Sequence, residues 1–206
     1  MYGIMKFKKY IKEINDDDFT DSIAKRLKKD CMPFIKEMKS NNLYNWFYRA
    51  TEHHYKDISK IKPRKNRRPR NMPLEIHKYM DKVFKKKFGW NVRSEGVFVS
   101  SDRNQLEYIY GDTYLFFPIG NYKYVYHPWV KDIFMKFDGE YDLDPKRISD
   151  ETIKKVKEGF HEIVPQYTNK NLGISYSNIV EVAFKCKSYY MVNEKFVDEL
   201  KKELKW

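Results

Sequence analysis

The segment NIVEVAFKCKSYYMVN, residues 178–193, decides the fold class. It is dense in β-branched and aromatic residues, and this composition predicts two consecutive strands near the end of the chain. Glu181 interrupts the apolar pattern of the first strand. A carboxylate inside such a strand is costly unless it is paired or faces a cleft, so Glu181 is the first candidate for a functional residue.

The same composition predicts further strands upstream, and helical periodicity predicts helices between and around them. No GxGxxG or GxxxxGK[ST] loop occurs, which argues against a Rossmann or P-loop domain. The pattern favours an α+β fold with mainly antiparallel strands, in a single domain over residues 1–206. Its parts are a helical N-terminal extension (1–42) and a core (43–206). Expected strands are 43–51, 96–101, 113–126 and 178–193, and expected helices are 18–31, 74–88, 152–164 and 196–204.

The formal net charge of +12 admits two interpretations. Charge of this size favours contact with nucleic acid or another anionic surface, or it reflects solubility and a coding bias toward Lys. Seven basic residues between Lys60 and Arg70 predict a loop, within a longer polar segment from Lys56 to Pro73. No apolar run predicts a membrane helix or a signal peptide, and Cys31 and Cys186 suggest neither a disulfide framework nor a metal site. We therefore expect a protein of a reducing cytosol.

Polar residues stand at three strand positions where the apolar pattern does not require them. They are Arg49 in WFYRAT, the pair Ser100-Ser101 in GVFVSSD, and Glu181. Taken singly, each has an ordinary explanation: an ion pair at an edge strand, a strand end before a helix cap, or a solvent-facing carboxylate. Taken together, they indicate a site, because no single structural need explains all three.

The order of these residues resembles the R–S–E signature of the ADP-ribosyltransferase superfamily. Tyr48-Arg49-Ala50 is similar to the family's first motif, Phe98-Val99-Ser100-Ser101 to its second, and Glu181-Val182-Ala183-Phe184 to its third. The chain as a whole resembles small, phage-encoded members of that superfamily. The resemblance spans about residues 43–193 and implies split, mainly antiparallel β-sheets with flanking helices.

The resemblance also implies an activity, the transfer of ADP-ribose from NAD to a macromolecule. Glu181 would be the catalytic carboxylate, which stabilises positive charge on the ribose as in glycosidases. Arg49 would contact a phosphate or the nicotinamide ribose. Ser100 would brace the site by hydrogen-bonding Glu181 or the ribose, with Ser101 beside it at the cofactor. Tyr110 or Phe116 would pack against the nicotinamide. NAD is the one cofactor implied, and no metal is implied.

Contact with the acceptor is expected from the loop before Glu181 and from the basic run. Tyr176 is the candidate in the first, with local packing as its alternative. Arg67, Arg68 and Arg70 are the candidates in the second, which could bind nucleic acid, an acidic protein face or the NAD phosphates, with a solvated loop as the alternative. Ile179 stands where arginine-modifying members carry an acidic or amide residue. This difference implies another acceptor, plain hydrolysis of NAD, or a scaffold without activity.

Two other function classes compete with the enzyme. One is a non-catalytic protein on the same fold that binds nucleic acid or a partner protein through residues 60–70. The other is a small nuclease or a structural virion component, which the absence of a clustered Asp/Glu/His set in the sequence makes the weakest interpretation. For the enzyme, the expected setting is the cytoplasm of a bacterial host, where the acceptor is a host or phage protein or a nucleic acid.

Overall fold

The computed structural model describes residues 16–43, 46–69 and 71–205, with side chains from Ser22 onward. Arg70 and the side chain of Phe19, which the sequence places on the first helix face, lie outside this part. The chain forms α1 (Asp16–Asp30), α2 (Met32–Ser40), β1 (Tyr48–Thr51), β2 (Ile58–Ile61), α3 (Leu74–Phe88), α4 (Val92–Glu95), β3 (Val97–Val99), α5 (Arg103–Tyr110), β4 (Asp112–Pro118), β5 (Tyr122–Tyr126), α6 (Ile133–Tyr141), α7 (Asp150–Ile163), α8 (Leu172–Ser177), β6 (Val182–Cys186), β7 (Tyr189–Asn193) and α9 (Val197–Leu204).

Within the described residues the strands form two antiparallel sheets. One has the order β1-β4-β7-β2 and the other the order β3-β6-β5. Backbone hydrogen bonds between Tyr48 and Ser100, in both directions at 2.8 and 3.1 Å, join the start of β1 to the end of β3 and so connect the two sheets. The predicted α+β class with mainly antiparallel strands is confirmed.

Side chains of the three-stranded sheet alternate between two hydrophobic cores. Val99, Val182 and Phe184 belong to a first core, which also contains the four-stranded sheet and helices α1, α2 and α9. Phe98 and Ala183, which point to the opposite face, belong to a second core with α3, α6 and α7. Because strand side chains have a period of two, the residues of β3 and β6 that face one core are separated by residues that face the other.

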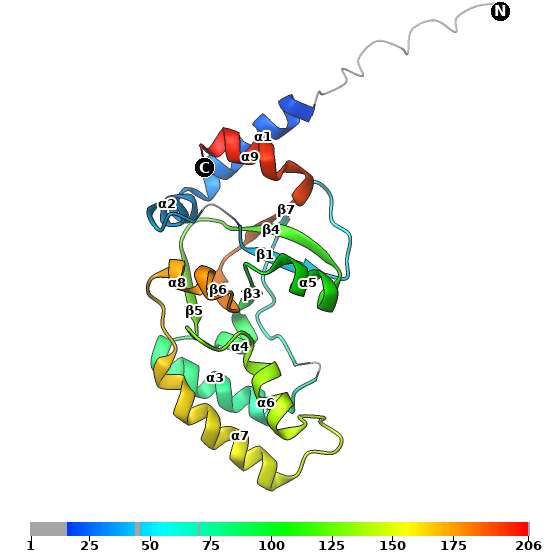
Figure 1. Ribbon diagram of the computed structural model, residues 1–206, viewed down its shortest axis with the longest axis vertical. Helices are drawn as coiled ribbons and strands as arrows, with labels where there is room; N and C mark the ends of the chain where they lie inside the picture. Colours follow the sequence, from blue (N-terminus) through cyan, green and yellow to red (C-terminus); the bar gives the residue numbers. More distant parts are fainter. Residues whose placement is uncertain (1–15, 44–45, 70, 206) are drawn as a thin grey trace, which may run out of the picture.

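The helices cover the two ends of this arrangement (Figure 1). Helices α1 and α9 lie side by side beyond the four-stranded sheet, and Lys28 and Glu203 form an ion pair between them. Helices α3, α6 and α7 lie at the other end, where Phe84 of α3 meets Phe160 of α7 at a ring-centroid distance of 5.1 Å. The N-terminal helices thus contribute to the same core as the sheets.

The sequence misplaced several local elements. The segment predicted as a loop from Lys56 to Pro73 contains β2, which pairs with β7. The loop expected over 172–180 contains α8, and neither α5 nor α6 was predicted. In the part of the chain that the structure describes, no helix combines the length and apolar character that crossing a bilayer requires.

Packing between the two sheets is concentrated on Phe184, which is fully buried. Its ring lies 5.1 Å from that of Phe116 and 5.9 Å from that of Phe34.

We expect Phe184→Ala to lower the free energy of unfolding by about 3–5 kcal/mol, since it leaves a cavity between the sheets. Urea denaturation measures this change. Tyr108→Ala is the control, because 93% of that side chain is exposed, and it should change stability by less than about 0.5 kcal/mol. A similar, small effect of both variants would contradict the packing.

Candidate active site around Glu181

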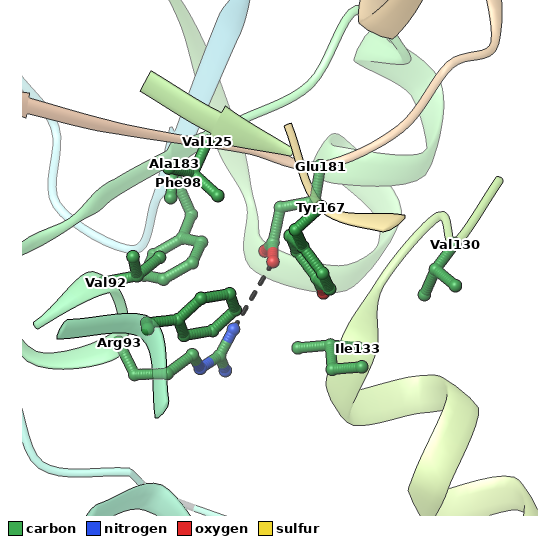
Figure 2. A pocket seen from close by; sticks show the side chains of 10 residues that line it. Val92, Arg93, Phe98, Val125, Val130, Ile133, Tyr167, Glu181 and Ala183 are labelled. Atoms are coloured by element: carbon green, nitrogen blue, oxygen red, sulfur yellow. Dashed lines mark hydrogen bonds and ion pairs between the residues drawn. The ribbon is translucent and has the colours of Figure 1, made fainter. Parts of the chain in front are cut away.

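Glu181 directly precedes β6 and points to the second core. The alternation along β6 places its side chain on the same face as Ala183, above an apolar hollow that Phe98, Val125 and Tyr167 help to line (Figure 2). Its backbone N–H donates to the carbonyl of Lys131 at 2.8 Å, which fixes the entry to the strand. A quarter of the Glu181 side chain remains exposed, so the carboxylate lies between a core and solvent.

This position changes the acidity of the carboxyl group. Burial raises the pKa of Glu181 to about 7, and the nearby carboxylate of Asp132 adds to the rise. Three guanidinium groups oppose it and favour the ionised form: those of Arg93, Arg67 and Arg49. A carboxyl group with a pKa near neutrality changes its charge within the range in which enzymes work.

Arg93 of α4 makes the direct contact with the carboxylate. Its Nη1 lies 3.5 Å from Glu181 Oε2, and its guanidinium carbon lies 4.7 Å from the centroid of the Phe98 ring. The Nε atom of Arg93 is buried and has no hydrogen-bond partner within the described residues. The sequence did not single out Arg93, because Val92–Glu95 is a single helical turn without a periodic pattern.

Arg67 also packs on the Phe98 ring, with its guanidinium carbon 4.8 Å from the centroid. Burial, with Arg93 and Arg49 close by, lowers the pKa of Arg67 to about 10. Its backbone N–H donates to the carbonyl of Ser94 at 3.1 Å, so this part of the basic run is attached to α4. The sequence assigned Arg67 to contact with the acceptor or with the NAD phosphates, and the structure places its guanidinium on the Phe98 ring, close to Arg93.

Arg49 and Ser100 lie at the same corner of the molecule as Glu181. Arg49 Nη1 donates to the carbonyl of Phe98 at 2.7 Å, and its side chain also hydrogen-bonds to Tyr189. Extending the β3–β6 register by one pair beyond Val99–Val182 sets Ser100 opposite Glu181. Ser100 is buried, and its hydroxyl accepts from the N–H of Asp102 at 3.1 Å. The three residues of the sequence signature are therefore brought together.

The other predicted residues have varied positions. Tyr110, at the end of α5, is half-exposed, and its pKa is raised by burial and then by the nearby carboxylates of Asp132 and Glu181. Ser101 donates to the carbonyl of Tyr176 at 3.0 Å and thereby joins β3 to α8. Phe116 is fully buried in the first core against Phe184, so it offers no surface to a nicotinamide ring, and we do not retain it as a ligand contact.

The residues predicted to contact the acceptor also differ in their positions. The ring of Tyr176 packs edge-on against buried Phe47, with centroids 5.9 Å apart, so the local-packing alternative describes its position. In the segment before Glu181 the exposed apolar side chains are Ile174 and Ile179. Arg68 is exposed on the basic loop, and Arg70 lies outside the described residues.

The hollow beneath Glu181 is small. Its volume of about 20 Å³ is near that of one water molecule, far below the several hundred Å³ of a typical ligand pocket. Arg93, Val92 and Phe98 form one of its walls (Figure 2). Glu181 and Arg93 therefore lie mostly buried beside this small apolar hollow, with side chains that are 25% and 13% exposed.

Comparisons with protein-family models, with curated proteins and with solved structures found no match to this chain. The chemistry of the site therefore has to be argued from its own geometry.

The raised pKa of Glu181 predicts a dependence of stability on pH. Between about pH 4.5 and 7 the native state holds a proton that the unfolded state has released, so wild-type stability falls as pH rises through this window. Glu181→Gln removes this titration. We expect the stability of the variant relative to wild type to increase by about 2–3 kcal/mol from pH 4.5 to pH 8, measured by urea denaturation. Glu162→Gln, at an exposed position on α7, is the matched control. If both variants respond to pH equally, Glu181 does not have this acidity.

Proposed function

We propose that this chain is an NAD-dependent mono-ADP-ribosyltransferase with Glu181 as its catalytic carboxylate. The observation that carries the proposal is one carboxylate at the head of β6, with the guanidinium groups of Arg49, Arg67 and Arg93 around it. NAD would supply a ribose whose bond to nicotinamide breaks, leaving positive charge on the sugar. A carboxylate stabilises such charge, and guanidinium groups fit the pyrophosphate of the same substrate.

The residues divide these tasks by position. Glu181 faces the reacting ribose and stabilises it electrostatically, which requires the ionised form. Its pKa of about 7 means that this form becomes predominant as pH rises past neutrality. Arg67 and Arg93 would receive the phosphates, and half-exposed Tyr110 offers a ring at the rim of the site. A nucleophile of the acceptor forms the new bond to the ribose and gives up its proton to solvent.

Binding of NAD requires movement at the site, because the hollow beneath Glu181 is too small for a dinucleotide. Stacking of a guanidinium on an aromatic ring is worth about 0.5–2 kcal/mol. Hydrogen bonds to a charged group are worth about 1.5–3 kcal/mol each. The side chains of Arg67 and Arg93 would therefore gain free energy by turning from the face of Phe98 to the pyrophosphate, while their backbone hydrogen bonds to Ser94 and Asp81 stay in place.

The acceptor would meet the surface beside the site. The basic loop that carries Arg67 also carries exposed cations, and they are Lys62, Arg64, Lys65 and Arg68. This surface suits an anionic acceptor, either a nucleic acid or an acidic protein face. The same loop favours the second candidate function, a protein on this fold that binds an anionic partner without catalysis.

Incubation with labelled NAD tests the enzyme directly. We expect the wild-type protein to release nicotinamide, or to transfer label to a component of a bacterial lysate, at a rate that rises between pH 6 and pH 8. Glu181→Gln should lower this rate by at least about 100-fold, because it removes the stabilising charge without changing the shape of the side chain. Glu162→Gln serves as the matched control and should retain the rate. Absence of turnover in both wild type and variant, with an intact fold, would leave the non-catalytic binding protein.

Two neighbouring arginines separate the two proposed binding surfaces. Arg67→Ala should weaken the binding of NAD at least about tenfold, measured by calorimetry, since Arg67 lies in the site. Arg68→Ala should leave NAD affinity unchanged. For a single-stranded oligonucleotide, Arg68→Ala should instead reduce the slope of log affinity against log salt by about 0.7. Equal effects of the two substitutions on both ligands would contradict the division into a substrate site and an anionic surface.

A further inference from the structure

A buried polar group behind the site has no role in the chemistry described above. Asp81, on α3, is buried in the second core region, where an unpaired carboxylate would be strongly destabilising. It accepts hydrogen bonds at Oδ1 from the backbone N–H of Arg93 at 2.7 Å and of Ser94 at 3.3 Å. The hydroxyl of Ser94 donates to its other oxygen. The carboxylate is thus used to hold α4.

His77 completes this group one helical turn earlier on α3. Its Nε2 lies 3.0 Å from Ser94 Oγ and 3.6 Å from Asp81 Oδ2. Residues four apart lie on the same face of a helix, so both side chains point at α4. A serine, a histidine and an aspartate are present, but the Asp81 carboxylate accepts a hydrogen bond from Ser94 and not from Nδ1 of His77. This arrangement differs from that of a nucleophilic triad.

The backbone around α4 makes the helix dependent on these contacts. Gly89 ends α3 with a φ of +79°, and Gly96 packs so closely that a Cβ there would lie 2.4 Å from the carbonyl oxygen of Val92. A helix of four residues has little stability of its own. The Asp81 carboxylate supplies acceptors for backbone N–H groups in its first turn, as a capping residue would.

We propose that Asp81, with His77 and Ser94, is a positioning residue that fixes Arg93 against Glu181. The Asp81 carboxylate accepts a hydrogen bond from the backbone N–H of Arg93, and the guanidinium of Arg93 lies 3.5 Å from the carboxylate of Glu181. Ser94 also connects this group to the basic loop, because its carbonyl accepts a hydrogen bond from the backbone N–H of Arg67. One buried carboxylate thus sets the position of two arginines of the site. The functional meaning of this arrangement rests on the proposed function, but the arrangement itself can be tested without turnover.

The test is the titration of Glu181, followed by NMR of the side-chain carboxyl carbon and assigned with Glu181→Gln. The charged or titratable groups that act on Glu181 come from several elements, and they are Arg49, Arg67, Arg93, Tyr110, Asp132 and Tyr167. Asp81→Ala removes a negative charge, and this effect alone would lower the pKa of Glu181. Release of Arg93 from the carboxylate would raise that pKa. The two explanations therefore predict opposite signs.

We expect Asp81→Ala and Arg93→Ala each to raise the pKa of Glu181 by about one pH unit, and the double variant to raise it no further. Ser94→Ala, a milder change, should give a smaller rise in the same direction. The control is Glu95→Ala, which removes the ion pair of α4 with Lys185 but no contact with Asp81 or Arg93, and should not change the titration. Additive effects of Asp81→Ala and Arg93→Ala, or a fall in the pKa with Asp81→Ala, would overturn the proposal.

Folding and function are separated in the same experiment. If Asp81→Ala does not fold, Ser94→Ala carries the test, since it removes the side-chain contact with Asp81 and keeps the volume nearly unchanged. A raised pKa in a protein that does not turn over NAD would retain the positioning role and reject the enzyme. Turnover in wild type with an unchanged titration in every Asp81 and Ser94 variant would reject the positioning role and retain the enzyme.

Discussion

A carboxylate that faces an apolar core must be compensated by positive charge or must take up a proton. Both apply in part to Glu181, since three arginines lie near it and its pKa is raised. Its place at the head of β6 leaves no other direction for the side chain, because Val182 occupies the face toward the first core. Burial raises its pKa to about 7, and this value persists although three arginines favour the ionised form. The charge state of Glu181 thus reflects two opposing effects: desolvation favours the protonated form, and the three guanidinium groups favour the ionised form.

This balance explains why remote segments meet at Phe98. The arginines come from β1, from the basic loop and from α4, and the carboxylate of Glu181 partly offsets their mutual repulsion. Two of the guanidinium groups stack on Phe98, and the third is held by its carbonyl. Each also has a second anchor away from Glu181: Tyr189 for Arg49, Ser94 for Arg67 and Asp81 for Arg93.

The sequence predicted those features that depend on local pattern. The strand containing Arg49 and the strands next to Ser100 and Glu181 were predicted, because alternation and aromatic content are local signals. Arg93 was missed since its proximity to Glu181 results from packing of α4, which has no periodic pattern. Phe116 was misplaced because an aromatic residue in an apolar strand reads the same whether it lines a pocket or fills a core. The strand β2 was hidden by the charge run that follows it.

Ile179 shows how the segment before Glu181 is constrained. Its φ of +53° is a left-handed conformation that costs a β-branched residue about 1–2 kcal/mol. Hydrogen bonds on either side hold it there. The backbone N–H of Val180 donates to the carbonyl of Ser175, and the side-chain amide of Asn178 donates to the carbonyl of Pro128. The turn directs an apolar side chain outward, two residues before the carboxylate. On the proposed function, an acceptor guanidinium would find no second carboxylate at this position. An acceptor with an apolar surface beside its nucleophile would fit this rim better than an arginine side chain would.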